Sequence, residues 1–210
     1  MKKSAIYLGM AALTLLSTAG GTMVHAADVG TQTNGEIKLQ APTQGAITLD
    51  TTKLPANLNF GSTEIKYTAD VDQIATADGA QKSAPTTTSI VVSDKRGGAV
   101  GWKLYLKQDK QFATGTGTNT DSKSLDGAQL TITTDKVTDN CGTAPDTGII
   151  NTSSTLTPGT DTNLLTAKKD QGEGDSTMNI TKYDLKVPGK SHKESDTYKS
   201  SLTWTFSDTI

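Results

Sequence analysis

Few side chains in this chain can act as a nucleophile or as a general base. Cys141 is the only cysteine, and the two histidines are His25 and His192. A serine or cysteine hydrolase needs a base beside its nucleophile, but no supporting motif surrounds Cys141 or any serine. His192 stands in the polar stretch GKSHKESD, which predicts a solvated loop. We therefore expect no catalytic residues.

Metal and cofactor chemistry have equally little support. A zinc cluster needs several Cys and His ligands, and this chain cannot supply them. The stretch DQGEGDS, residues 170–176, holds carboxylates and glycines, but its spacing does not match a calcium-binding loop. Glycoside hydrolysis needs a pair of carboxylates. Any Asp-rich chain contains many possible pairs, so the sequence does not identify a particular one. We expect neither metal nor cofactor, and a secreted polysaccharide hydrolase is the enzymatic alternative.

The two tryptophans are the other side chains that could carry a function. Trp102 lies in VGWKLYLKQ, residues 100–108, and Trp204 lies in LTWTFSDTI, residues 202–210. An aromatic ring in a strand either packs in the core or anchors an interface. Because strand side chains alternate between faces, each tryptophan falls in an apolar stripe. In the first segment the stripe is Val100, Trp102, Leu104 and Leu106, and the other face carries Lys103, Tyr105 and Lys107. In the second segment the stripe is Tyr198, Leu202, Trp204 and Phe206.

Short alternating runs separated by Gly, Pro, Asn and Asp fill most of the chain, and no long helical pattern is visible. We expect an all-β fold, an antiparallel β-sandwich of the immunoglobulin-like or a related type, with long Thr/Gly-rich loops. Residues 95–101, KRGGAVG, predict a glycine-rich hairpin. The predicted strands cover residues 36–41, 46–50, 56–60, 89–94, 100–108, 128–135, 178–187 and 198–208.

The pattern of residues at the N-terminus predicts a secretory signal peptide. Lys2 and Lys3 precede the apolar run Ala5–Leu16, and Val24 and Ala26 are small or aliphatic, as signal peptidase requires. The run is shorter than the about 20 residues that span a bilayer. We predict cleavage after Ala26, a signal peptide of residues 1–26 and a single mature domain of residues 27–210.

Charge and cysteine content narrow the class of protein further. Removal of Lys2 and Lys3 lowers the formal net charge from −2 to −4, which argues against nucleic-acid binding because phosphate backbones need clustered Lys and Arg. With one cysteine no intramolecular disulfide can form, and disulfide-poor export fits a Gram-positive cell surface. We expect no transmembrane anchor in the mature chain and no covalent wall-sorting signal.

Two segments resemble the signature motifs of the WxL domain, a family of exported surface proteins of low-GC Gram-positive bacteria. The stretch VVSDKRGGAVGWKLYLKQ, residues 91–108, is similar to the V-x-D-x-R…GW-x-L region of that family. The C-terminal YKSSLTWTFSD, residues 198–208, is similar to its Y…LTWTL-S-D ending, with Phe206 where the family usually has leucine. The motifs stand in the family's order, and the resemblance covers residues 27–210.

The resemblance implies a noncatalytic protein that is secreted and retained noncovalently at the cell wall, with peptidoglycan as ligand. It also implies partnership with membrane-anchored WxL-interacting surface proteins, and adhesion to host or plant surface ligands. Docking onto the partner protein, without direct glycan binding, is the alternative. On either interpretation we expect the binding residues among the two motifs: Trp102, Leu104, Tyr198, Leu202, Trp204 and Phe206. Core packing is the competing interpretation for both tryptophans.

Overall fold

A computed structural model describes residues 36–40, 46–115, 123–147 and 153–208. The predicted signal peptide and its cleavage site lie outside these residues. The chain divides into two units, Met1–Lys38 and Leu39–Ile210, and the fold below is that of the second unit.

The second unit is built almost wholly from β-strands, with one short 3-10 helix, η1 (Thr51–Lys53). The strands are β1 (Ile47–Leu49), β2 (Val71–Ile74), β3 (Thr88–Asp94), β4 (Trp102–Gln108), β5 (Ala113–Thr114), β6 (Gln129–Thr134), β7 (Thr138–Asp139), β8 (Asp146–Thr147), β9 (Ser153–Leu156), β10 (Asp161–Ala167), β11 (Gly174–Val187), β12 (Tyr198–Lys199) and β13 (Leu202–Ser207).

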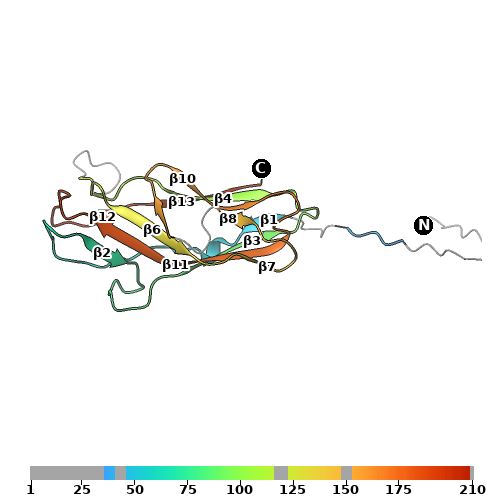
Figure 1. The fold of residues 1–210 in the computed structure, drawn as a ribbon, viewed down its shortest axis with the longest axis horizontal. Helices are drawn as coiled ribbons and strands as arrows, with labels where there is room; N and C mark the ends of the chain where they lie inside the picture. Colours follow the sequence, from blue (N-terminus) through green and yellow to red (C-terminus); the bar gives the residue numbers. More distant parts are fainter. Residues whose placement is uncertain (1–35, 41–45, 116–122, 148–152, 209–210) are drawn as a thin grey trace, which may run out of the picture. The chain divides into compact units, whose positions relative to one another are not determined.

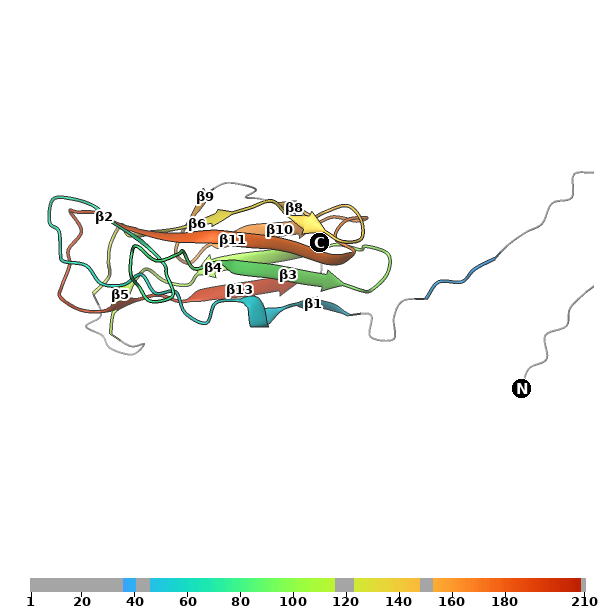
Figure 2. The same ribbon diagram turned by 90° about the horizontal axis from the view of Figure 1, so that it is seen from below.

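Two antiparallel sheets face each other across the core. The seven-stranded sheet has the order β1-β3-β11-β6-β9, with β2 and β7 also paired to β11. The four-stranded sheet has the order β13-β4-β10-β8, and β12 and β5 form a separate pair. Figure 1 shows β4, β10 and β13 in one layer and β6 and β11 in the other, and Figure 2 shows the long β11 lying between β3 and β6. The predicted all-β antiparallel sandwich is confirmed.

Alternating side chains of the two sheets form the core. In both β3 and β4, every second residue is buried along the whole strand, which is the pattern of a sheet packed on one face. The seven-stranded sheet contributes Ile90, Ile132, Met178 and Ile180, and the four-stranded sheet contributes Trp102, Leu104, Leu106 and Leu165, all without exposed surface. The apolar stripe predicted for Trp102, Leu104 and Leu106 is therefore correct.

The predicted hairpin at residues 95–101 is wrong. β3 belongs to the seven-stranded sheet and β4 to the four-stranded sheet, so KRGGAVG carries the chain from one layer to the other. Ala99 (φ 42°) and Gly101 (φ 94°) have left-handed backbone conformations, which interrupt the strand alternation. Val100 is consequently 53% exposed instead of sharing the buried face of Trp102.

Some of the other predicted strands do not form, one is broken in two, and one observed strand was not predicted. The described residues 36–40 contain no strand, and neither does 56–60. The predicted strand 198–208 is broken into β12 and β13 at two serines whose hydroxyls bond to the segment after β4: Ser200 Oγ donates to Lys110 O (2.6 Å) and Ser201 Oγ to Asp109 Oδ2 (2.7 Å). β10 was not predicted, although it is the inner neighbour of β4.

Candidate functional site

The two motif segments pair as neighbouring antiparallel strands. β13 forms the edge of the four-stranded sheet and pairs with β4, so that Trp204 lies opposite Leu106 and Phe206 opposite Leu104. The rings of Trp102 and Phe206 also meet, with centroids 5.9 Å apart and planes tilted by 42°. Segments about a hundred residues apart in the sequence therefore form one continuous structure.

The six residues predicted to bind a ligand fall into two groups by exposure. Trp102 and Leu104 have no exposed surface, so their side chains pack in the core. Tyr198, Leu202, Trp204 and Phe206 are half-buried and pack against the edge of the core. A binding role for the six residues stays a prediction.

The indole of Trp102 is fixed by a tight turn before β11. Its Nε1 donates a hydrogen bond to Gly172 O at 3.2 Å, which satisfies the one polar atom of a fully buried ring. Gly172 has a φ of +67°, and a Cβ there would lie 2.9 Å from Trp102 Nε1 and 2.8 Å from Ala167 Cβ. This turn therefore requires glycine for both its conformation and its close approach to the indole.

An ion pair between Asp94 and Arg96 links the two motifs, and sequence reasoning did not single it out. Asp94 is 1% exposed and accepts two hydrogen bonds from the guanidinium, from Nε to Oδ1 at 2.9 Å and from Nη2 to Oδ2 at 2.7 Å. Arg96 Nη2 also donates to Gly101 O at 2.9 Å, and Nη1 donates to Asp208 O at 3.4 Å. Arg96 therefore joins the ends of β3 and β13 to the start of β4. We call this arrangement the arginine clamp.

Two sequence signals could have identified the arginine clamp. Arg96 is the only arginine in the chain, and it follows Asp94 at the spacing of the V-x-D-x-R motif. Burial acts to raise the pKa of Asp94, but the hydrogen bonds and charge of Arg96 outweigh it and lower that pKa. Asp94 is therefore ionised at neutral pH and paired. A buried carboxylate without such a partner would be strongly unfavourable.

The opposite face of the motif strands points away from the core and is polar. Lys103, Tyr105 and Lys107 of β4 are half-buried, and Thr203 and Thr205 of β13 are exposed. Thr205 lies directly opposite Tyr105, and Thr203 lies opposite Lys107. Among these five residues the aromatic one is Tyr105, which lies between Lys103 and Lys107 on β4.

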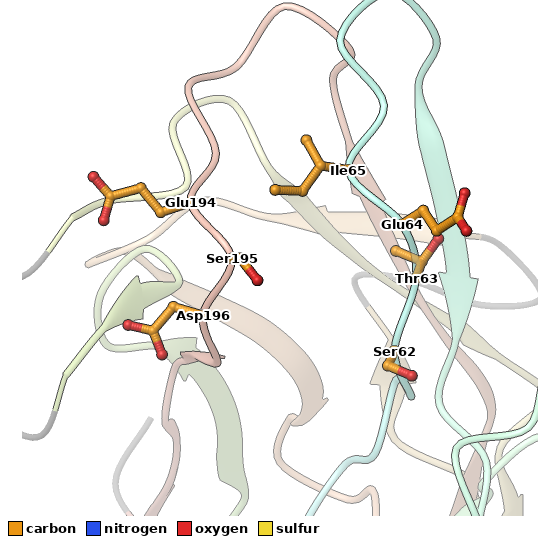
Figure 3. A pocket seen from close by; sticks show the side chains of 7 residues that line it. All are labelled: Ser62, Thr63, Glu64, Ile65, Glu194, Ser195 and Asp196. Atoms are coloured by element: carbon orange, nitrogen blue, oxygen red, sulfur yellow. The ribbon is translucent and has the colours of Figure 1, made fainter.

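A shallow depression of about 530 Å³ lies between two loops, residues 62–65 and 194–196. Its carboxylates do not converge: in Figure 3 Glu64 points to one side, Glu194 and Asp196 to the other, and Ile65 into the space between. This arrangement does not form a paired acid and base. His192 is exposed, and its Nε2 lies 3.4 Å from Oε1 of Glu194.

Other sources of chemistry are sparse in the described part of the chain. No group of three or more His, Cys, Asp or Glu side chains there is placed to hold a metal ion. Cys141 is a free, exposed thiol. None of the helices within the described ranges has the length and apolar character needed to cross a membrane.

Comparison with known proteins identifies the family. Residues 27–209 match the model of a family described as WxL domain, surface cell wall-binding. No curated protein and no solved structure matches the chain. The matched region covers well over half of the sequence and includes both motif strands and the arginine clamp. The chain therefore belongs to the WxL domain family of surface cell wall-binding domains.

Proposed function

We propose that this protein is a noncatalytic surface protein that attaches noncovalently to peptidoglycan. The observation that carries the proposal is the family match over residues 27–209, whose description is surface cell wall-binding. The polar outward face of the paired motif strands supports it, because it presents hydroxyl, ammonium and aromatic groups together. On this proposal residues 1–26 direct export, and residues 27–210 remain at the wall as one domain.

Co-sedimentation with purified peptidoglycan sacculi tests the proposal. Residues 27–210 are mixed with sacculi freed of teichoic acids and of protein, and the bound fraction is measured. We expect saturable binding that denaturant reverses and that leaves no protein covalently attached. The soluble fraction should contain no released sugar or peptide fragments. Wild-type protein that stays in the supernatant at all sacculus concentrations would refute wall binding, and released fragments would favour the hydrolase alternative.

The second candidate function is docking onto a membrane-anchored WxL-interacting protein. The position of β13 at the end of the four-stranded sheet, as formed by the described residues, favours it. An edge strand can pair its backbone N–H and C=O groups with another chain. Its apolar residues Leu202, Trp204 and Phe206 are half-buried, and aromatic residues are enriched at the centres of interfaces. Such a complex would place the domain in an adhesive surface assembly that contacts host or plant ligands.

Separate binding experiments distinguish the two functions. The purified domain is titrated with the partner ectodomain and, independently, with sacculi. Tight partner binding with no sacculus binding would favour docking alone. Trp204→Ala serves as the probe of the edge strand, because it removes half-buried surface there and leaves the outward face of β4 unchanged. Loss of partner binding with retained sacculus binding would place the two ligands on different surfaces.

A further inference from the structure

On the outward face of the four-stranded sheet, Tyr105 lies at the centre of a group of polar side chains from three neighbouring strands. Residues that lie directly opposite each other in antiparallel strands project from the same face. Tyr105 therefore stands in a row with Thr205 of β13 and Asn163 of β10, its partners in the two neighbouring strands. Within β4, Lys103 and Lys107 lie on either side of Tyr105, each about 7 Å away at the rise of a strand.

The two lysines differ in how far their charge is already compensated. Lys107 Nζ lies 4.0 Å from Asp109 Oδ1, and Lys107 is also opposite Asp161 in the β4–β10 register. Asp109 in turn accepts hydrogen bonds from Ser201 Oγ (2.7 Å) and Thr203 Oγ1 (2.9 Å). Among the described residues, Lys103 forms no ion pair with a carboxylate. The uncompensated positive charge of this face is therefore at Lys103, the middle residue of the W-x-L motif.

We propose that this outward face, centred on Tyr105 and flanked by Lys103, is the surface that binds a carboxylate-bearing glycan, the peptidoglycan strand. The inference rests on the proposed wall-binding function and assigns it a surface. The residues named as family signature, Trp102 and Leu104, point to the core and hold the strand in place. The alternate residues of the same strand meet the ligand.

The chemistry of the face fits a sugar polymer that carries acid groups. The tyrosine ring offers an apolar surface with a polar tip, against which the C–H face of a sugar ring can lie. The exposed hydroxyl of Thr205 offers a donor and an acceptor at its edge. The hydroxyl of Thr203, which donates to Asp109 Oδ2, offers an acceptor. Lys103 supplies a cation for a peptide-stem carboxylate, on a protein whose net charge is otherwise negative. A neutral glycan would use the ring and the hydroxyls but not the lysine.

Sacculus binding by four variants of residues 27–210 tests the proposal. Tyr105→Thr, which keeps a good strand former, should weaken binding about tenfold or more, as expected for a central aromatic contact. Tyr105→Phe keeps the ring and should restore most of the affinity. Lys103→Gln should weaken binding about two- to fivefold, in the range of a partly exposed charge pair. Lys107→Gln should change it less than about twofold, because its charge is already compensated.

Lys182→Gln is the matched control on the other sheet. Lys182 Nζ lies 3.0 Å from Asp184 Oδ2 and its side chain is 42% exposed, so the substitution removes the same charge from a distant surface. Its binding should equal that of the wild type. Thermal unfolding of every variant verifies that the fold persists before binding is compared.

Salt and a neutral polymer test the charge requirement. Raising NaCl from about 0.05 M to about 0.5 M should weaken wild-type binding, because the screening length falls to a few ångströms. Lys103→Gln should show a flatter dependence. Chitin, an uncharged N-acetylglucosamine polymer, should bind more weakly than sacculi.

Each failure has a distinct meaning. Absence of wild-type binding overturns the proposed function and this inference together. Normal wild-type binding that Tyr105→Thr and Lys103→Gln leave intact overturns the surface alone. Chitin binding as tight as sacculus binding, without salt dependence, overturns the assignment of a carboxylate-bearing ligand.

Discussion

Replacement of Arg96 by glutamine perturbs the structure at the point where both motifs meet. The substitution removes four side-chain hydrogen bonds: two to Asp94, one to Gly101 O and one to Asp208 O. Asp94 would be left 1% exposed and without its cation. Breaking a buried ion pair from one side costs about 3–5 kcal/mol. Because the Arg96 side chain is itself 21% exposed, we expect the lower end, about 3 kcal/mol.

Urea unfolding followed by tryptophan fluorescence measures this loss, since Trp102 lies in the strand that the clamp holds. About 3 kcal/mol corresponds to a decrease in Tm of about 6–12 °C for a domain of this size. Lys182→Gln is the control, because its exposed pair with Asp184 should contribute less than about 1 kcal/mol. A free-energy change below about 1 kcal/mol for Arg96→Gln would refute the view that the clamp is a structural link.

The same variant has a pH signature. Burial acts to raise the pKa of Asp94, but the hydrogen bonds and charge of Arg96 hold that pKa below its ordinary value. The ionised carboxylate therefore stabilises the fold fully above the ordinary value, and this contribution is lost as the pH falls through the lower pKa of the folded state. In Arg96→Gln burial is no longer opposed, and the pKa of Asp94 should rise above its ordinary value. The difference in stability between wild type and variant should therefore be largest near about pH 7 and narrow toward about pH 3. A difference that widens at low pH would contradict the assigned cause.

Further expectations concern the tryptophans, the tight turn and the cysteine. Trp102→Ala should destabilise the fold by about 3–5 kcal/mol because the ring is fully buried, whereas Trp204→Ala should cost about 1–2 kcal/mol because part of the indole stays in water; equal losses in urea unfolding would contradict their different burial. Gly172→Ala should lower the free energy of unfolding by about 3 kcal/mol or more, through overlap with Trp102 and backbone strain. The control is Gly159→Ala, where φ is +79° and a Cβ would have no neighbour within 4 Å. It should lose only the strain energy, about 1–2 kcal/mol. Cys141→Ser should change stability by less than about 0.5 kcal/mol, and the native thiol should react completely with a thiol reagent without denaturant; slow reaction that needs unfolding would show that it is not accessible.

The local sequence pattern was sufficient to predict the strands that are buried on one face. Buried residues alternate with less buried ones along β3, β4 and β6, and each strand was predicted to within about two residues. β10 escaped prediction because its sequence, DTNLLTA, places two buried leucines side by side at a register shift opposite β4. A bulge of this kind breaks the period-two pattern, and only pairing with β4 reveals the strand.

The predicted hairpin at KRGGAVG failed for a similar reason. Glycines with left-handed φ fit a tight turn and a crossover between layers equally well, and sequence spacing does not tell them apart. The choice depends on where β3 and β4 find partners: β3 pairs with β11 and β1, and β4 pairs with β10 and β13. These partners lie far along the chain, so their contribution is invisible locally.

Period-two alternation and short motifs are local properties, so the all-β class, the inward stripe of the W-x-L strand and the resemblance to a wall-binding family could all be predicted from the chain. The pairing of the two motifs, the full burial of Trp102 beside a half-buried Trp204, and the link from Asp94 through Arg96 to the C-terminal strand are visible only in the folded protein. Burial and pairing depend on which strand lies alongside, and that neighbour can be far away in the sequence. β4 is flanked on both sides, whereas β13 pairs with one strand, β4, within the part of the chain that the structure describes.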